Sequence, residues 1–164
     1  MAEQSATTRV TVGLSSCGIA AGAGKVYEAF RNELAERGLA TELCRTGCVG
    51  MCYREPIVDV EIPGEGIITY GDVSPDHVAR IVEEHVVGGK PVEDLLVRAE
   101  GRDLPDDSYY ARQVRLVLRN VGRIDPESID DYIEAGGYEA LRRALTEMTP
   151  EGVVEEVKTS GLRG

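Results

Sequence analysis

The chain has 164 residues, is 42% hydrophobic, and carries 29 acidic against 18 basic side chains, a formal net charge of −11. This length can bury one ordinary hydrophobic core, or one small domain with an appendage. The acidic surplus excludes a nucleic-acid partner from our expectations, because binding a phosphate backbone needs a basic face.

Residues 1–11 lack the basic-then-apolar pattern of a signal peptide, and no stretch of the sequence approaches eighteen apolar residues. We therefore expect a cytoplasmic protein without direct membrane insertion. In a reducing cytosol, clustered cysteines indicate metal ligands or redox groups rather than disulfides.

Strand and helix patterns alternate through the first part of the chain. Periodicity and turn residues predict a strand over 9–14, a helix over 23–37, a strand over 39–44, a hairpin over 56–70, and a helix from Ser74-Pro75 to Gly88-Gly89. A small mixed sheet with helices packed against it fits this order, β-α-β-loop-β-β-α, and the thioredoxin-like fold has the same order. The predicted fold class is therefore α/β.

The second part of the chain differs in composition. Residues 99–111 are polar and contain proline and acids, which predicts a linker, and an extended segment follows over 112–120. Helix starts are predicted at Asp125-Pro126, Gly136-Gly137 and Thr149-Pro150, and the last helix is stopped by Gly161. These short helices have few apolar residues for a core of their own, so we expect this module to dock onto something else.

Three cysteines follow one another at intervals of four, and the fourth lies far upstream. The set is Cys17, Cys44, Cys48 and Cys52. The loop of the last two also contains Gly47 and Gly50, and a backbone without Cβ atoms lets N–H groups approach thiolate sulfurs closely. We therefore predict an iron–sulfur site.

Two other interpretations of the cysteines remain open. Buried structural cysteines are commoner for any single cysteine, and a zinc-stabilised interaction domain would use the same four thiolates. A thiol–disulfide enzyme is a weak alternative, because the chain has no C-x-x-C motif. His77 and His85 are predicted to lie on a solvated helix face rather than to bind metal.

Longer motifs carry a family resemblance. The stretches "SSCGIAAGAGKVYEAF", "RTGCVGMCYREPIVDVEIPGEGIITYGDVSPDHVARIVEEHVVGGKPV" and "GRIDPESIDDYI…GGY" closely resemble the flavoprotein, NADH-binding subunits of complex I and the beta subunits of NAD-linked hydrogenases and formate dehydrogenases. In that family a thioredoxin-like [2Fe-2S] ferredoxin domain precedes the flavin domain. The resemblance covers about residues 9–164.

The resemblance implies a ferredoxin domain over 9–98, the linker over 99–111, and the helical start of a flavin domain over 112–164. It implies one-electron transfer through a [2Fe-2S] cluster, with the other subunits of a redox complex or the missing flavin domain as partners. The family's glycine-rich flavin loop begins after "SGLRG", where this sequence stops. We therefore expect FMN and NAD(H) only in a complete parent subunit, and no NADH oxidation by this chain alone.

The resemblance also implies a ligand set with one gap. Related ferredoxins use a C-x4-C pair after the first strand and a C-x3-C pair in the second loop, here Cys48 and Cys52. Val12 or Gly13 stands where the first member of the earlier pair belongs, with Cys17 as its second member. We predict that Cys44 replaces the lost thiolate; the alternative is three thiolates plus water or an exogenous ligand.

Overall fold

The computed structural model describes residues 7–99 and 114–163. The chain divides into two compact units, Met1–Pro126 and Glu127–Gly164. Most of the predicted linker, residues 100–111, lies outside the described residues, as do 112–113 of the predicted extended segment. In the described residues, no helix is both long enough and apolar enough to cross a membrane.

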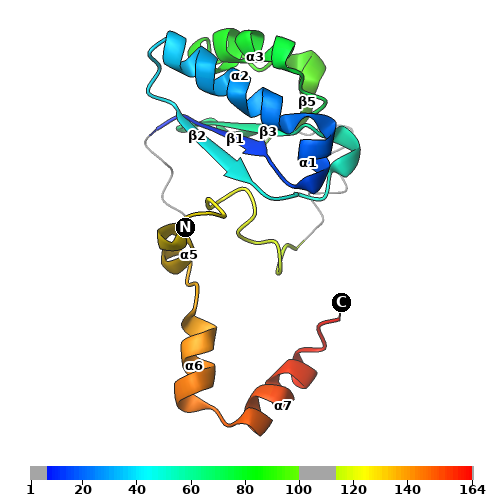
Figure 1. Cartoon of the computed structure of the whole chain (residues 1–164), viewed down its shortest axis with the longest axis vertical. Coiled ribbons are helices and arrows are strands. Elements are labelled where there is room, and N and C mark those ends of the chain that lie inside the picture. The colour runs from blue at the N-terminus through cyan, green and yellow to red at the C-terminus, as the bar shows by residue number, and fades with distance from the viewer. Residues whose placement is uncertain (1–6, 100–113, 164) are drawn as a thin grey trace. The chain divides into compact units, whose positions relative to one another are not determined.

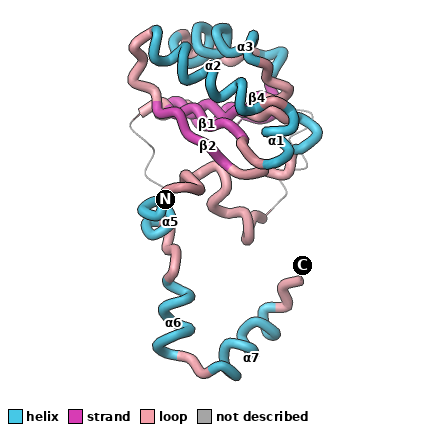
Figure 2. Tube along the Cα trace, in the orientation of Figure 1, coloured by secondary structure: helices cyan, strands magenta, loops and turns pink. Residues whose placement is uncertain are grey.

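The first unit is built on one five-stranded sheet (Figures 1 and 2). Its strands are β1 (Arg9–Gly13), β2 (Glu42–Thr46), β3 (Val58–Ile62), β4 (Gly66–Tyr70) and β5 (Leu96–Ala99). The spatial order is β2-β1-β3-β4-β5. The β1–β2 pair is parallel and the other pairs are antiparallel. The mixed sheet confirms the predicted α/β class.

Helices cover one side of this sheet, as Figure 1 shows for α2 and α3. The helical elements of the first unit are α1 (Ser16–Ala21), α2 (Ala23–Glu36), η1 (Cys52–Arg54), α3 (Pro75–Ile81), the π-helical η2 (Val82–Val87) and η3 (Glu93–Leu95). The predicted helix over 23–37, the helix start at Ser74-Pro75 and the hairpin are all confirmed. The short elements α1 and β5 were not predicted, because six and four residues carry little periodic signal.

The core lies between the sheet and these helices. Strand alternation turns every second side chain toward the helices. The fully buried side chains on this face include Val10, Val12, Val58, Val60 and Tyr70 from the sheet and Val26, Phe30, Ile81 and Val82 from the helices. This packing fixes the ends of β1 and β2, from which the two cysteine-bearing loops leave.

A buried histidine lies in this core. His85 of η2 is 1% exposed, and its Nδ1 lies 2.8 Å from the Tyr70 hydroxyl, which also accepts the Val92 N–H. The prediction of a solvated helix face for both histidines is therefore wrong for His85, because this residue continues the buried stripe of Val78, Ile81 and Val82 at three- and four-residue steps. His77 is half-buried, and its Nδ1 accepts the Ser74 N–H at the start of α3.

We expect the protein to lose stability as the pH falls from about 6.5 toward 4. Burial lowers the pKa of His85 from 6.5 to about 4, so between these values the unfolded chain binds a proton that the folded chain excludes. The stabilisation is complete above pH 6.5 and is lost progressively below it. Urea unfolding at pH 7 and pH 5 measures this loss.

The control for this experiment is His85→Asn, which keeps an acceptor for the Tyr70 hydroxyl but does not titrate. Its free energy of unfolding should depend less on pH in this window. Equal pH dependence of the two proteins would contradict the prediction.

Residues 114–126 form turns within the first unit. The extended segment predicted for this region is wrong over residues 116–120, which form a bend and turns. The backbone N–H of Gly122 donates to the hydroxyl of Thr46, at the end of β2, over 2.8 Å. This contact places the segment beside the loop that carries Cys48.

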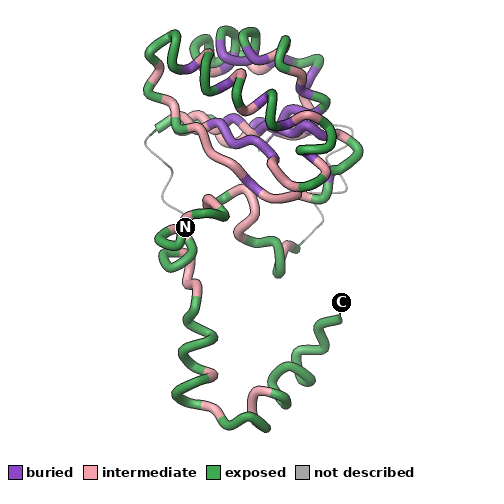
Figure 3. The backbone as a smooth tube through the Cα atoms, viewed as in Figure 1, coloured by how far each residue is buried: buried purple, intermediate pink, exposed green. Residues whose placement is uncertain are grey.

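The second unit contains three helices: α5 (Ile129–Glu134), α6 (Glu139–Glu147) and α7 (Pro150–Ser160). The predicted start at Thr149-Pro150 is confirmed, and the Thr149 hydroxyl accepts the Gly152 N–H. Ser128, not Asp125, caps α5. Between residues 127 and 163 no residue is buried, as the colouring of Figure 3 shows.

Candidate metal centre

Two loops at the same end of the sheet carry the candidate site. The first leaves β1 and enters α1, whose first turn contains Cys17. The second leaves β2, passes Cys48, and enters η1 at Cys52. Backbone hydrogen bonds hold the two loops together, since the Leu14 N–H donates to Thr46 and the Gly13 N–H donates to Ile57. The parallel pairing of β1 with β2 therefore brings Cys17 beside the later cysteines.

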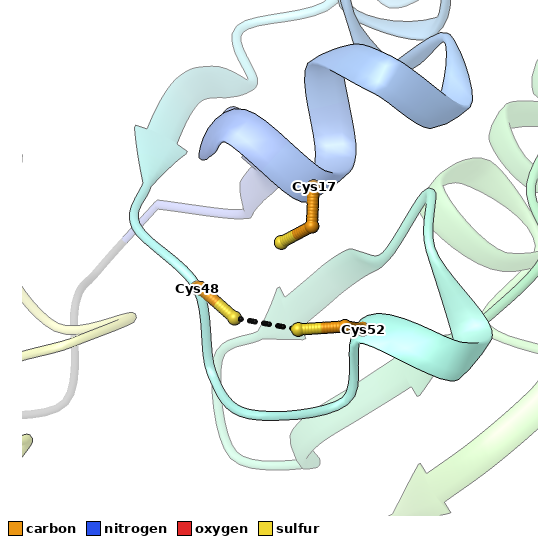
Figure 4. A group of neighbouring side chains, drawn as sticks. All are labelled: Cys17, Cys48 and Cys52. Carbon is orange, nitrogen blue, oxygen red and sulfur yellow. Dashed lines mark hydrogen bonds between the residues drawn. The ribbon is translucent and has the colours of Figure 1, made fainter.

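Three cysteine sulfurs converge at this end of the sheet (Figure 4). The Sγ atoms of Cys17, Cys48 and Cys52 all lie within 4.8 Å of one another. The sulfurs of Cys48 and Cys52 are 3.3 Å apart, and the two residues belong to the same loop. Three convergent thiols in this space are a donor set for a thiophilic metal centre.

Cys44 is not part of this group of sulfurs. It lies in the middle of β2, opposite Thr11 of β1, whereas the other three lie beyond the strand ends. Its neighbour Leu43 packs against the core, so alternation along the strand turns Cys44 to the other face of the sheet. The structure thus brings together three of the four predicted ligands.

Backbone and hydroxyl donors surround the sulfurs. Gly50 has φ of +92°, a conformation that favours glycine, and its N–H donates to the Cys48 sulfur over 3.3 Å. The Ser15 hydroxyl lies 2.8 Å from the Cys17 sulfur. N–H and O–H donors of this kind stabilise thiolate charge and tune the potential of a bound cluster.

The thiol pKa values differ within the group. The hydrogen bond with Ser15 lowers the pKa of Cys17. The adjacent Cys48 sulfur, which competes for the same proton, raises the pKa of Cys52 to about 11. A metal that binds here must therefore displace protons.

Glu55 also contacts the site, although it was not among the residues predicted from the sequence. Its residue exposure is only 9%, its Oε2 accepts the Ile57 N–H over 2.9 Å, and its Oε1 lies 3.6 Å from the Cys17 sulfur. Glu55 lies three residues after Cys52, and no sequence motif marks it as a metal ligand. Only the fold brings it to Cys17, 38 positions away.

Gly18→Ala should destabilise this site. A Cβ at position 18 would lie 2.3 Å from the Gly13 carbonyl oxygen and 3.1 Å from Glu55 Oε2, so β1 or α1 would have to move. We expect a loss of about 1–3 kcal/mol in the free energy of unfolding, as for other overpacked sites. Denaturant titration measures it.

Gly24→Ala is the matched control for that substitution. Gly24 is exposed in α2 and a Cβ there would meet nothing within 4 Å, so the gain in helix propensity should stabilise by about 0.5–1 kcal/mol. The same sign for both substitutions would contradict our account of the site.

The sheet, its helical cover and the convergent thiols define a small α/β protein that binds a metal centre through cysteines. No protein-family model matches the chain. The chain is 34% identical over 96 residues to the NADP-reducing hydrogenase subunit HndB of Solidesulfovibrio fructosivorans, which covers 58% of this chain and 76% of that relative. It is 35% identical over 79 residues to a 2Fe-2S ferredoxin of Aquifex aeolicus, covering 46% and 68% of the two chains.

A solved structure agrees with these relatives. The thioredoxin-like [2Fe-2S] ferredoxin from Aquifex aeolicus superposes with a TM-score of 0.52 at 28% identity, over 60% of this chain and 96% of that one. The chain belongs to the family of thioredoxin-like [2Fe-2S] ferredoxins. A further match, 62% identical over 53 residues, is to the NADP-reducing hydrogenase subunit HndC of S. fructosivorans; it covers 32% of this chain and only 11% of that subunit.

Proposed function

We propose that this chain carries single electrons through a [2Fe-2S] cluster within an NAD(P)H-linked flavoprotein oxidoreductase. The observation that supports this most directly is the convergence of Cys17, Cys48 and Cys52 within 4.8 Å. Membership of the ferredoxin family supports the same assignment. When bound, a [2Fe-2S] cluster accepts and releases one electron.

The residues around the cluster position have separable roles. Cys17, Cys48 and Cys52 supply thiolates, and the Gly50 N–H donates to the Cys48 sulfur. The Cys52 side of the site faces outward, since Cys52 is exposed and the next residue, Tyr53, is 68% exposed. We propose this exposed edge as the place where electrons enter and leave. The sequence predicts Cys44 as the fourth ligand, and this stays a prediction.

The partners that we propose are other subunits of a redox complex, or a flavin domain. The names of the relatives support this: two are subunits of an NADP-reducing hydrogenase, HndB and HndC. FMN and NAD(H) belong, in this proposal, to the complete parent subunit. We also propose that residues 9–98 form the cluster domain and that 112–164 form the start of a flavin domain. The proposed location of the protein is the cytoplasm.

Metal analysis of the purified chain tests the proposal. We expect a coloured protein with two irons and two acid-labile sulfides per chain, and a paramagnetic signal after reduction, since one electron is then shared by the two irons. Zinc is the competing outcome, because a tetrahedral site with thiolate ligands suits it. A colourless protein with one zinc per chain would replace our proposal with that of a zinc-stabilised interaction domain.

A further inference from the structure

The arrangement of the three sulfurs leaves one ligand position unassigned. This inference rests on the proposed [2Fe-2S] function. Four ligands hold such a cluster, two on each iron. Cys48 and Cys52, 3.3 Å apart in one loop, form a natural pair for one iron. Cys17 on the other loop has no cysteine partner within the converging group, so its iron needs a second ligand from elsewhere.

A buried carboxylate lies beside Cys17. Glu55 is held between the two loops, with Oε1 3.6 Å from the Cys17 sulfur and Oε2 accepting the Ile57 N–H. The cysteine sulfur and this N–H are its hydrogen-bond partners within residues 7–99 and 114–163, and no described cation forms an ion pair with it. A buried carboxylate without a cation is costly, and a bound metal is the largest local charge that a site can supply.

The backbone is shaped to admit this carboxylate. A Cβ at Gly13 would lie 3.3 Å from Glu55 Oε2, and a Cβ at Gly18 would lie 3.1 Å from it. The carboxylate therefore occupies the space into which a side chain at position 13 would project. Gly13 is one of the two positions at which the family resemblance implies a missing thiolate.

We propose that the Glu55 carboxylate is the fourth protein ligand, binding with Cys17 to one iron while Cys48 and Cys52 bind the other. Oxygen replaces one thiolate in this set. Other [2Fe-2S] clusters also replace thiolates on one iron only, since two histidines take the place of two cysteines there.

Two other groups compete for the same position. The Ser15 hydroxyl lies 2.8 Å from the Cys17 sulfur, but it is neutral and already serves as a hydrogen-bond partner of that sulfur. Cys44 is the ligand that the sequence predicts, and it lies outside the group of converging sulfurs. A single set of substitutions distinguishes the three.

Glu55→Gln is the principal test, because the amide oxygen still accepts the Ile57 N–H while the anionic ligand is lost. We expect it to lose at least half of the bound iron, or to keep two irons with shifted g-values in the electron paramagnetic resonance spectrum. Ser15→Ala, which loses only a hydrogen bond to the Cys17 sulfur, should keep two irons per chain. Cys44→Ser and the exposed Glu65→Gln should keep the wild-type iron content and g-values. An unchanged iron content and spectrum in Glu55→Gln would overturn the assignment.

Two further measurements do not depend on that variant folding. In the oxidised wild-type protein, Mössbauer spectroscopy should show two different iron sites of equal area, one with sulfur ligands only and one with an oxygen ligand. Two identical sites would overturn the proposal. The double substitution Gly13→Cys with Glu55→Ala should restore two irons per chain and make the two sites alike.

These outcomes separate the ligand assignment from the proposed function. A wild-type protein without iron and sulfide would end the [2Fe-2S] function and the assignment together. A wild-type protein with two irons, paired with an unaltered Glu55→Gln variant, would end only the assignment.

Discussion

Replacing Cys48 or Cys52 by serine should remove or badly perturb the cluster of this protein. Their sulfurs are 3.3 Å apart and lie in one short loop, so each is expected to bind the same iron. A serine hydroxyl is neutral at ordinary pH and is a poor substitute for a thiolate. We expect either a large fall in visible absorption and iron content per chain or a clearly altered spectrum, both measured after anaerobic purification.

Cys44→Ser is the matched comparison, since it makes the same chemical change in a strand outside the converging group. With Glu55 as fourth ligand, Cys44→Ser keeps the iron content and the reduced spectrum of the wild type. With the four-cysteine set predicted from the sequence, it loses the cluster as the loop variants do. Full iron content together with an unchanged spectrum in either Cys48→Ser or Cys52→Ser would refute the metal centre.

Amide hydrogens in α5, α6 and α7 should exchange at least about a thousandfold faster than those of β1 and β3. Opening free energies run from near zero in poorly packed regions to the full stability in a core, about 5–15 kcal/mol, and each 1.4 kcal/mol is about tenfold in rate. No residue between 127 and 163 is buried, and the exposed apolar side chains there include Ile129, Ile133, Leu141, Leu145, Val154 and Val157.

Hydrogen exchange followed by mass spectrometry measures this difference within one sample. Peptides from α2, which buries Val26, Phe30 and Leu34, provide the internal reference. Protection of α5–α7 equal to that of α2 would contradict the prediction. A partner that covers the apolar side chains should slow the exchange of these three helices and leave the sheet unchanged.

Local signals in the sequence predicted much of the fold. The helix over 23–37, the start at Ser74-Pro75, the start at Thr149-Pro150 and the Pro-Gly hairpin all rest on capping, periodicity or turn residues within a few positions. The start predicted at Asp125-Pro126 was displaced, since Ser128 caps the helix instead. Asp125 and Ser128 each carry a side-chain oxygen that can cap a helix, and the sequence alone did not show which of them would do so.

The sequence analysis missed α1 and β5 and misplaced His85. Six-residue and four-residue elements depend on their neighbours for stability rather than on their own periodicity. His85 was assigned to a solvated face, although it lies four and three residues after Ile81 and Val82, on the helical stripe that packs beside Tyr70. The two short elements are decided by packing between segments far apart in the chain.

The candidate site also combines features that local sequence predicts with features that only the tertiary structure decides. The spacing of Cys48 and Cys52 beside Gly50 predicted that this loop binds a metal centre, because ligands three or four positions apart meet through local geometry alone. Which upstream groups join them was decided by the pairing of β1 with β2 and by the placing of Ile57 beside Gly13. That arrangement brings Cys17 and Glu55 together across 38 positions. It leaves Cys44 within a strand, because alternation along a strand depends on the sheet register and not on distance in the sequence.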